Sequence, residues 1–126
     1  MNVEFQYRYR DFGNFKNYGS VVFGNQSGLP TDEINRGLIQ LTGDDETFAA
    51  SRLGIPEMFF TDFPYNPDLD WEMHEYCRVS PTKLPVNDAQ GRDIEELLSQ
   101  MKANANRRYA AKTRNLRFPS DLSSIR

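Results

Sequence analysis

The first residues of the chain alternate regularly between apolar and polar side chains. Every second residue from Val3 to Tyr9 is apolar or aromatic, and the residues between them are polar or charged. A period of two is typical of a strand with one buried and one exposed face. Glycine and asparagine at 13–17 favour a turn, and the β-branched and aromatic residues of 18–23 favour a returning strand. The pattern predicts an antiparallel hairpin with a long loop that carries aromatic rings.

Two later segments have the apolar spacing of helices. Thr31 is a residue type that caps helices, and two carboxylates follow it, so we predict a helix over about 31–41. Asp93 is an N-cap of the same kind, also followed by carboxylates, and it begins a helix that extends to about residue 106. The apolar face of this second helix consists of Ile94, Leu97, Leu98 and Met101.

The central segments predict short elements. A helical turn is expected over 48–53, and the apolar run 58–60 after Pro56 predicts a central strand. Residues 71–79 alternate again, with Glu75 as a charged residue on the apolar face, and predict a further strand. The expected fold is one α+β domain over 1–126: a small antiparallel sheet with an N-terminal hairpin, two helices packed on it and an extended C-terminal arm.

Composition restricts the class of protein. Aromatic residues make up 13% of the 126 residues, which predicts a folded chain with a ring-rich core. The sequence has no apolar run long enough to span a membrane and no apolar signal-peptide region, so we expect a protein of the cytoplasm without membrane contact. With only one cysteine and one histidine, no intrachain disulfide and no Cys/His zinc site can form, and we expect neither a metal nor a cofactor.

Charge is distributed unevenly along the chain. The net charge of −3 argues against binding to DNA or RNA, for which a basic domain is expected. Residues 102–126 nevertheless contain seven Lys and Arg and one Asp, a balance of +6, which leaves −9 for the rest. Arginines can grip phosphate with two parallel hydrogen bonds, so this arm could close over a phosphorylated ligand. The alternative is a solvated tail that pairs with the acidic body.

The hairpin offers a second candidate site. Phe12, Phe15 and Tyr18 lie near its loop, and Arg8 and Arg10 lie on the polar face of the first strand. Nucleobases stack well on exposed rings, so rings beside fixed arginines could form a nucleotide platform. The alternative for each ring is a contact in the core or in a dimer.

A third candidate is catalytic. Alternation places Glu72, His74 and Tyr76 on one strand face, where a general acid–base pair is geometrically feasible. The more common explanation is an ordinary polar strand face, with Cys77 nearby as a small buried hydrophobe. The sequence lacks a Walker loop, a dinucleotide fingerprint and the HExxH and GxSxG motifs. We therefore expect binding without turnover.

Four stretches resemble the phage anti-Thoeris sponge family: "YRYRDFGNFKNYGSVVF" at 7–23, "LGIPEMFF" at 53–60, "DLDWEMHEY" at 68–76 and the arginine-rich arm. The resemblance implies a small cytoplasmic protein that sequesters the cyclic ADP-ribose isomer (gcADPR) that signals in Thoeris defence. It also implies a homodimer or hexamer with the ligand between protomers. The ligand contacts that it implies are Arg108, Arg114 and Asp121 in the arm, the further polar contacts Arg52 and Asn87, and Tyr76 as a weaker choice for the stacking ring.

Some members of that family also resemble sponges for the cyclic di- or trinucleotides of CBASS defence. By this resemblance Arg8, Arg10 and the hairpin loop could serve as a second nucleotide site. Two other classes of function stay open. An interaction protein would use its acidic body and basic arm to inhibit another protein, and a small nucleotide hydrolase would use Glu72 and His74.

Overall fold

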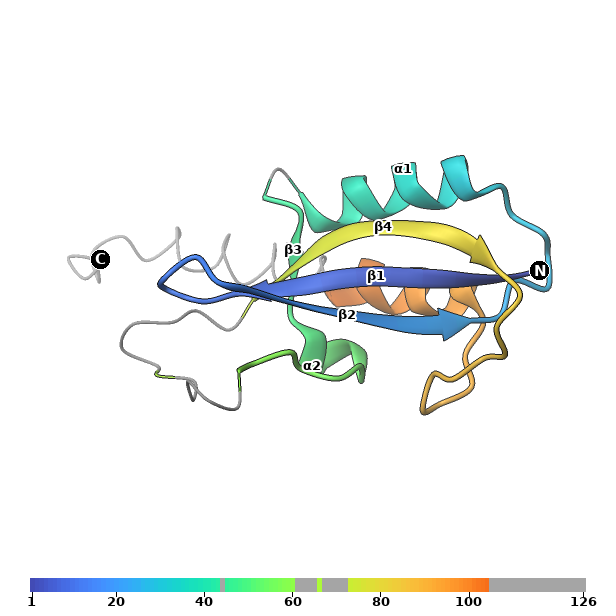
Figure 1. The fold of residues 1–126 in the computed structure, drawn as a ribbon. Coiled ribbons are helices and arrows are strands. Elements are labelled where there is room, and N and C mark those ends of the chain that lie inside the picture. The colour runs from blue at the N-terminus through green and yellow to red at the C-terminus, as the bar shows by residue number, and fades with distance from the viewer. Residues whose placement is uncertain (44, 61–65, 67–72, 105–126) are drawn as a thin grey trace, which may run out of the picture.

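The computed structural model describes residues 1–43, 45–60, 66 and 73–104. Within them, an antiparallel sheet of four strands has the order β2-β1-β4-β3, and the fold is α+β as expected (Figure 1). The described elements are β1 (Asn2–Arg10), β2 (Lys16–Phe23), α1 (Thr31–Thr42), β3 (Thr47–Phe48), α2 (Ala50–Leu53), β4 (His74–Thr82) and a helical segment at 94–104. No helix of this described part is long and apolar enough to cross a membrane.

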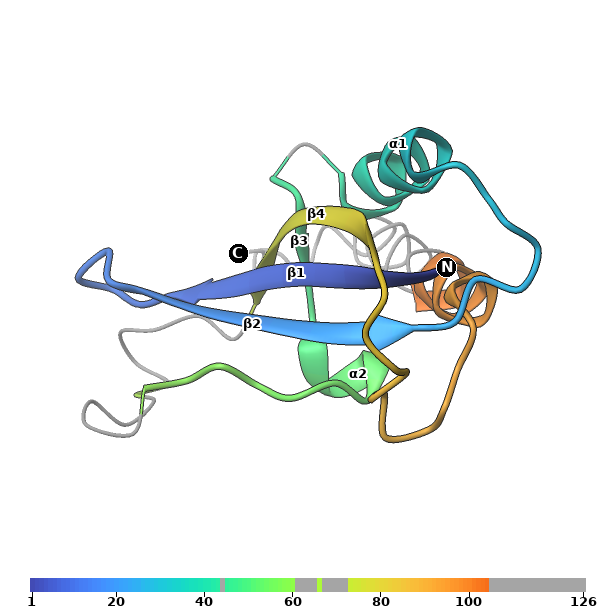
Figure 2. The ribbon, with the colours of Figure 1, turned by 45° about the vertical axis from the view of Figure 1, so that its right-hand side comes forward.

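The N-terminal hairpin is confirmed. β1 pairs with β2 from Val3 opposite Phe23 to Arg10 opposite Lys16, and buried and partly exposed residues alternate strictly along β1. In the loop, the Asp11 carboxylate accepts a hydrogen bond from the Phe15 amide at 2.9 Å, and Asn14 adopts a positive φ of 69°. Figure 2 shows that the loop end of this hairpin extends away from α1 and from the helix at 94–104.

β4 differs from its prediction in the faces that its residues occupy. The expectation put Glu75 and Cys77 on the apolar face, but His74 and Tyr76 are buried and Glu75 and Cys77 are partly exposed. The cause is a β-bulge. Gln6 pairs with Arg78 and Tyr7 pairs with Tyr76, so the extra residue Cys77 shifts the alternation by one position. Glu75 is therefore an outward-facing carboxylate and no exception to the pattern.

The predicted central strand at 58–60 is wrong. Residues 55–60 form no strand, and side chains satisfy the backbone where a strand would use a neighbouring strand. The Met58 amide donates to Nε2 of His74 at 2.9 Å, and Asn17 donates to the Met58 carbonyl at 3.1 Å. The Tyr7 hydroxyl donates to the Pro56 carbonyl at 2.6 Å. A short apolar run has the same pattern in a strand and in a chain packed on a core, so periodicity cannot separate them.

The helix predictions are confirmed with changes at the ends. Pro30, with extended backbone angles, occupies the N-cap of α1, so Thr31 is the first helical residue and makes no capping hydrogen bond. The second helix begins as expected: Asp93 accepts from the Glu95 amide at 3.2 Å, and Glu96 accepts from the Asp93 amide at 2.9 Å. The helical turn expected at 48–53 is α2 alone, since Phe48 belongs to β3.

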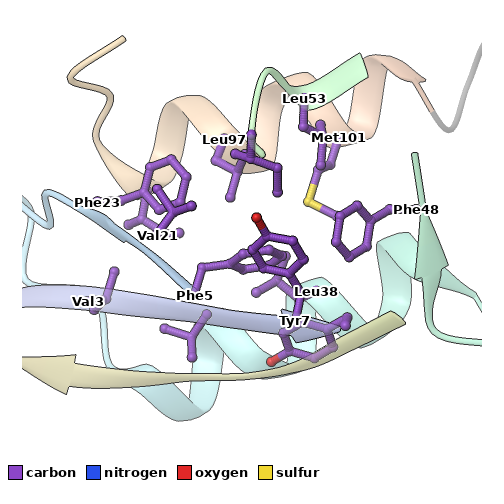
Figure 3. Close-up of a cluster of buried hydrophobic side chains, with 14 of the residues drawn as sticks. Val3, Phe5, Tyr7, Val21, Phe23, Leu38, Phe48, Leu53, Leu97 and Met101 are labelled. Atoms are coloured by element: carbon purple, nitrogen blue, oxygen red, sulfur yellow. The ribbon is translucent and has the colours of Figure 1, made fainter. Parts of the chain in front are cut away.

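Aromatic rings form the centre of the core, where the helices meet one face of the sheet (Figure 3). Phe5 stacks on Tyr76 with a centroid distance of 5.8 Å and meets Phe23 and Phe48 edge-on. Apolar residues of the helices complete this cluster: Ile34, Leu38, Ala50, Leu53, Ile94, Leu97 and Met101. Because all of them contact the inward side of the sheet, the face that bears the even-numbered residues of β1 is the outer face.

One amide side chain of α1 secures the bulge of β4. Asn35 accepts from the Val79 amide at 2.8 Å, donates to the Val79 carbonyl at 2.9 Å and also accepts from the Tyr76 hydroxyl. Its side chain thus supplies the donor and acceptor that a strand partner would supply. The pairing fixes α1 against β4 just where the ladder to β1 is irregular.

Candidate functional site on the outer face of the sheet

The outer face near the hairpin loop concentrates charge around one carboxylate. Arg8 donates through Nε to Glu75 Oε1 at 2.6 Å, and Arg10 donates through Nε and Nη2 to the two carboxylate oxygens at 3.1 Å. The three side chains are partly exposed, at 29% for Arg8, 32% for Arg10 and 17% for Glu75. Two guanidinium groups thus share one carboxylate, so the cluster keeps one net positive charge.

The arginines change the protonation behaviour of this cluster. Burial by itself raises the pKa of the Glu75 carboxyl, but the hydrogen bonds from Arg10 and Arg8 outweigh it, and the pKa is lowered overall. The hydrogen bond to Glu75 likewise raises the pKa of Arg8. Glu75 and Arg8 therefore both carry their charge at neutral pH.

A ring adjoins the charged cluster. Tyr18, opposite Arg8 in the hairpin, is 62% exposed, and its hydroxyl accepts a long hydrogen bond of 3.4 Å from Arg8 Nη1. The Arg8 guanidinium carbon lies 5.9 Å from the centroid of the Tyr18 ring, within the range of cation–π attraction. At the loop, Phe12 and Phe15 are also exposed, and Arg10 donates through Nη1 to Asn14. The structure thus places these three rings outside the core, so the alternative of a core contact is wrong for them.

A shallow, open pocket of about 400 Å³ lies beside Tyr18 on the sheet. Its lining residues carry a carboxylate, an amide, three hydroxyls and a thiol, groups that can donate and accept hydrogen bonds around a small planar ligand. Burial raises the pKa of the Cys77 thiol, so this group stays a neutral thiol at physiological pH. The residues that line the pocket are Glu4, Gln6, Tyr7, Tyr18, Gly19, Ser20 and Cys77.

The other candidate residues lie elsewhere. Tyr76 is buried in the core, where burial raises its pKa to about 12, and its ring stacks on Phe5. Arg52 is exposed on α2, and its carbonyl accepts a hydrogen bond from Gln100 at 2.9 Å. Asn87 is exposed but holds the edge of β2, because its side-chain oxygen accepts from the Val22 amide at 2.8 Å. The hairpin group is thus separate from these three residues.

The arm falls outside the described residues. Arg108, Arg114 and Asp121, the contacts implied by the resemblance, all belong to 105–126, as Glu72 of the catalytic alternative belongs to 67–72. The partner of Glu72 in that alternative, His74, is fully buried among the rings of Tyr7, Tyr9 and Phe59. Without exposure, its imidazole has no access to a substrate at the surface.

Sequence reasoning missed Glu75 as the centre of the cluster and also missed a buried ion pair. Arg92 donates to Asp88 through Nε at 2.8 Å and Nη2 at 2.9 Å, and through Nη1 to Gln100 at 2.8 Å. The bulge, which is not visible in the sequence, concealed the role of Glu75. The spacing of four residues between Asp88 and Arg92 in "DAQGR" is a sequence signal for the ion pair. Such spacing is weak evidence, because ion pairs on the surface contribute little to stability.

Comparison with protein-family models, with curated proteins and with solved structures returned no match.

Proposed function

We propose that this protein binds cyclic ADP-ribose-type signalling nucleotides and sequesters them without chemical change. The observation that carries the proposal is the Arg8–Tyr18 pair on the outer face, an exposed ring and a fixed guanidinium beside an open pocket. The resemblance of the sequence to anti-Thoeris sponges supports the same class of ligand. In the infected cell, such capture would block Thoeris defence by removing its signal.

In the proposed complex, the adenine ring of the ligand stacks on Tyr18 and a phosphate oxygen pair receives two hydrogen bonds from Arg8. Stacking on an aromatic side chain contributes about 1–3 kcal/mol per base, and charge-assisted hydrogen bonds to phosphate are about twice as strong as neutral ones. Hydroxyl and amide groups of the pocket then remain for the ribose. The arm residues Arg108, Arg114 and Asp121, proposed from the resemblance alone, would add contacts from the other end of the chain.

Calorimetry against cyclic ADP-ribose and its glycosidic isomer tests the proposal. We expect stoichiometric binding by the wild type and about tenfold or greater weakening in Tyr18→Ala, because the variant loses the stacked ring. Ile39→Ala is the matched control, since Ile39 is an exposed apolar residue of α1. Its affinity is expected to equal that of the wild type.

The complex is then heated and the released nucleotide is analysed by chromatography. Recovery of the intact ligand is expected of a sponge. A hydrolysed product would identify an enzyme instead, and the absence of binding to every cyclic ADP-ribose isomer would contradict the proposal altogether.

A further inference from the structure

The two arginines of the outer-face cluster use their donors differently. Arg10 commits Nε and Nη2 to Glu75 and Nη1 to Asn14, so each of its nitrogens is bonded within the protein. Arg8 commits only Nε to Glu75; Nη1 makes the long contact to Tyr18, and Nη2 makes no hydrogen bond to the described residues. Arg8 therefore retains the edge formed by its two terminal nitrogens, which can hold a phosphate or carboxylate with two parallel bonds.

Glu75 is what fixes this edge. The carboxylate lies opposite Arg8 in the strand register and is bonded to Arg8 Nε at 2.6 Å. Arg10 in turn holds both carboxylate oxygens and is itself tied to the hairpin loop through Asn14. A free arginine side chain loses rotamer entropy when it is immobilised. Here that cost is met on folding, before any ligand binds.

We propose that Glu75 is a positioning residue of a site for the anionic group of a nucleotide, with Arg8 as the group that binds it. Glu75 holds the Arg8 guanidinium so that its terminal nitrogens are presented beside Tyr18, while Arg10 and Asn14 hold Glu75. The inference rests on the proposed function and names the residues that recognise the phosphate. It also assigns Arg8 and Arg10, which the sequence could not distinguish, to different roles.

The sign of one substitution separates positioning from simple electrostatics. Removing a negative charge from the neighbourhood of an anion should tighten anion binding if Coulomb forces alone decide. If Glu75 positions Arg8, Glu75→Ala should instead weaken cyclic ADP-ribose binding by about tenfold. The reason is that the Arg8 guanidinium is then no longer held in place for its charge-assisted hydrogen bonds to the phosphate. Glu75→Gln keeps an oxygen that can accept from Arg8 Nε, so its affinity should lie between those of wild type and Glu75→Ala.

Calorimetry with two probes supplies the test. Cyclic ADP-ribose carries phosphate and adenosine does not, so the substitutions at Glu75 should affect only the former. Arg8→Ala should lose at least as much affinity as Glu75→Ala, and the double variant should lose no more than Arg8→Ala, because the two residues act through one contact. Glu33→Ala, which removes an exposed carboxylate of α1, is the charge-matched control and should bind as the wild type does.

Each contrary outcome is informative. Tighter or unchanged cyclic ADP-ribose binding in Glu75→Ala would overturn the inference and leave the proposed function standing, as would equal weakening for adenosine. Absence of wild-type binding to cyclic ADP-ribose would overturn both. If circular dichroism shows that Glu75→Ala does not fold, Arg8→Lys replaces it as the test. Lysine keeps the positive charge but lacks Nε and the paired terminal nitrogens of the guanidinium. Wild-type affinity in this variant would refute the positioning role.

Discussion

Asp88 and Arg92 are charged residues that are almost completely buried, at 7% and 5% exposure. Hydrogen bonds within the protein replace those that the two charged groups would make to water. Two parallel hydrogen bonds join the side chains, and the Arg92 amide donates to the same carboxylate at 2.9 Å. The guanidinium also lies over the ring of Phe23 at 5.5 Å. Because Gln100 bonds both Arg92 and the Arg52 carbonyl, the pair connects the 88–92 turn, the helix at 94–104 and α2.

Asp88→Asn should destabilise the protein strongly. The substitution leaves the Arg92 charge buried without its counter-ion, and breaking one side of such a pair costs about 3–5 kcal/mol. Urea denaturation followed by circular dichroism measures the free energy of unfolding. Asp32→Asn, at an exposed position in the first turn of α1, is the control and should cost less than about 1 kcal/mol. A loss at Asp88 as small as that of the control would contradict this account.

The same pair predicts a dependence of stability on pH. The hydrogen bonds from Arg92 lower the pKa of the Asp88 carboxyl in the folded state. A carboxyl of lowered pKa contributes stability above its unfolded pKa of about 3.9, and that contribution disappears as the pH falls through the folded value. Acid titration of the free energy of unfolding should therefore be less steep below about pH 4 in Asp88→Asn than in the wild type.

Two glycines in or beside the helices differ in backbone conformation. α2 ends at Gly54, which adopts the left-handed region at φ 69° and donates its amide back to the helix. A Cβ at this position would lie 2.5 Å from Nε2 of Gln90. Gly37, inside α1, has ordinary helical geometry and no neighbouring atom within 4 Å of such a Cβ. The fold therefore requires a glycine at position 54 but not at position 37.

Replacing each glycine by alanine should change stability in opposite directions. Gly54→Ala forces an L-residue into the left-handed region and should cost about 1–2 kcal/mol. Gly37→Ala, in an open helical position, should add about 0.5–1 kcal/mol. Thermal unfolding of the two variants beside the wild type measures both. A midpoint temperature that Gly54→Ala does not lower would contradict the first argument, and one that Gly37→Ala does not raise would contradict the second.

At the scale of the whole molecule, the two faces of the sheet carry different groups. Its inner face contacts the helices through the ring-rich cluster, whereas its outer face carries Glu75, Arg8 and Tyr18. Since β1 contributes Tyr7 to the one face and Arg8 to the other, the proposed ligand on the outer face would stabilise the same strands that form the core. Binding should therefore be visible in global stability.

Thermal unfolding in the presence of cyclic ADP-ribose tests this coupling. A ligand that binds only the folded state stabilises it by about 2.7 kcal/mol at one hundred times its dissociation constant, so the midpoint temperature should rise steadily with ligand concentration. Arg8→Ala should require higher concentrations for the same shift, and Arg36→Ala, which removes an exposed positive charge from α1, should not. A midpoint that is independent of ligand would contradict binding to the folded protein.

The sequence by itself determined the hairpin, the two main helices and the capping box at Asp93, because in these segments period and local chemistry agree. It could not place residues 58–60, whose apolar run is compatible with a strand and with the observed packing against Tyr9 and His74. It also could not reveal the bulge at Cys77, since one extra residue in a ladder depends on the partner strand.

Only the tertiary structure decided which side of β4 faces outward. Because that side faces outward, Glu75 lies beside Arg8 and Arg10, about sixty-five residues away in the sequence. No local sequence pattern encodes this contact. Strand alternation identifies the residues that share a face, but the register between strands selects the face and the partners. The exposed rings and arginines of the hairpin were therefore visible in the sequence, whereas the carboxylate that bonds both arginines was not.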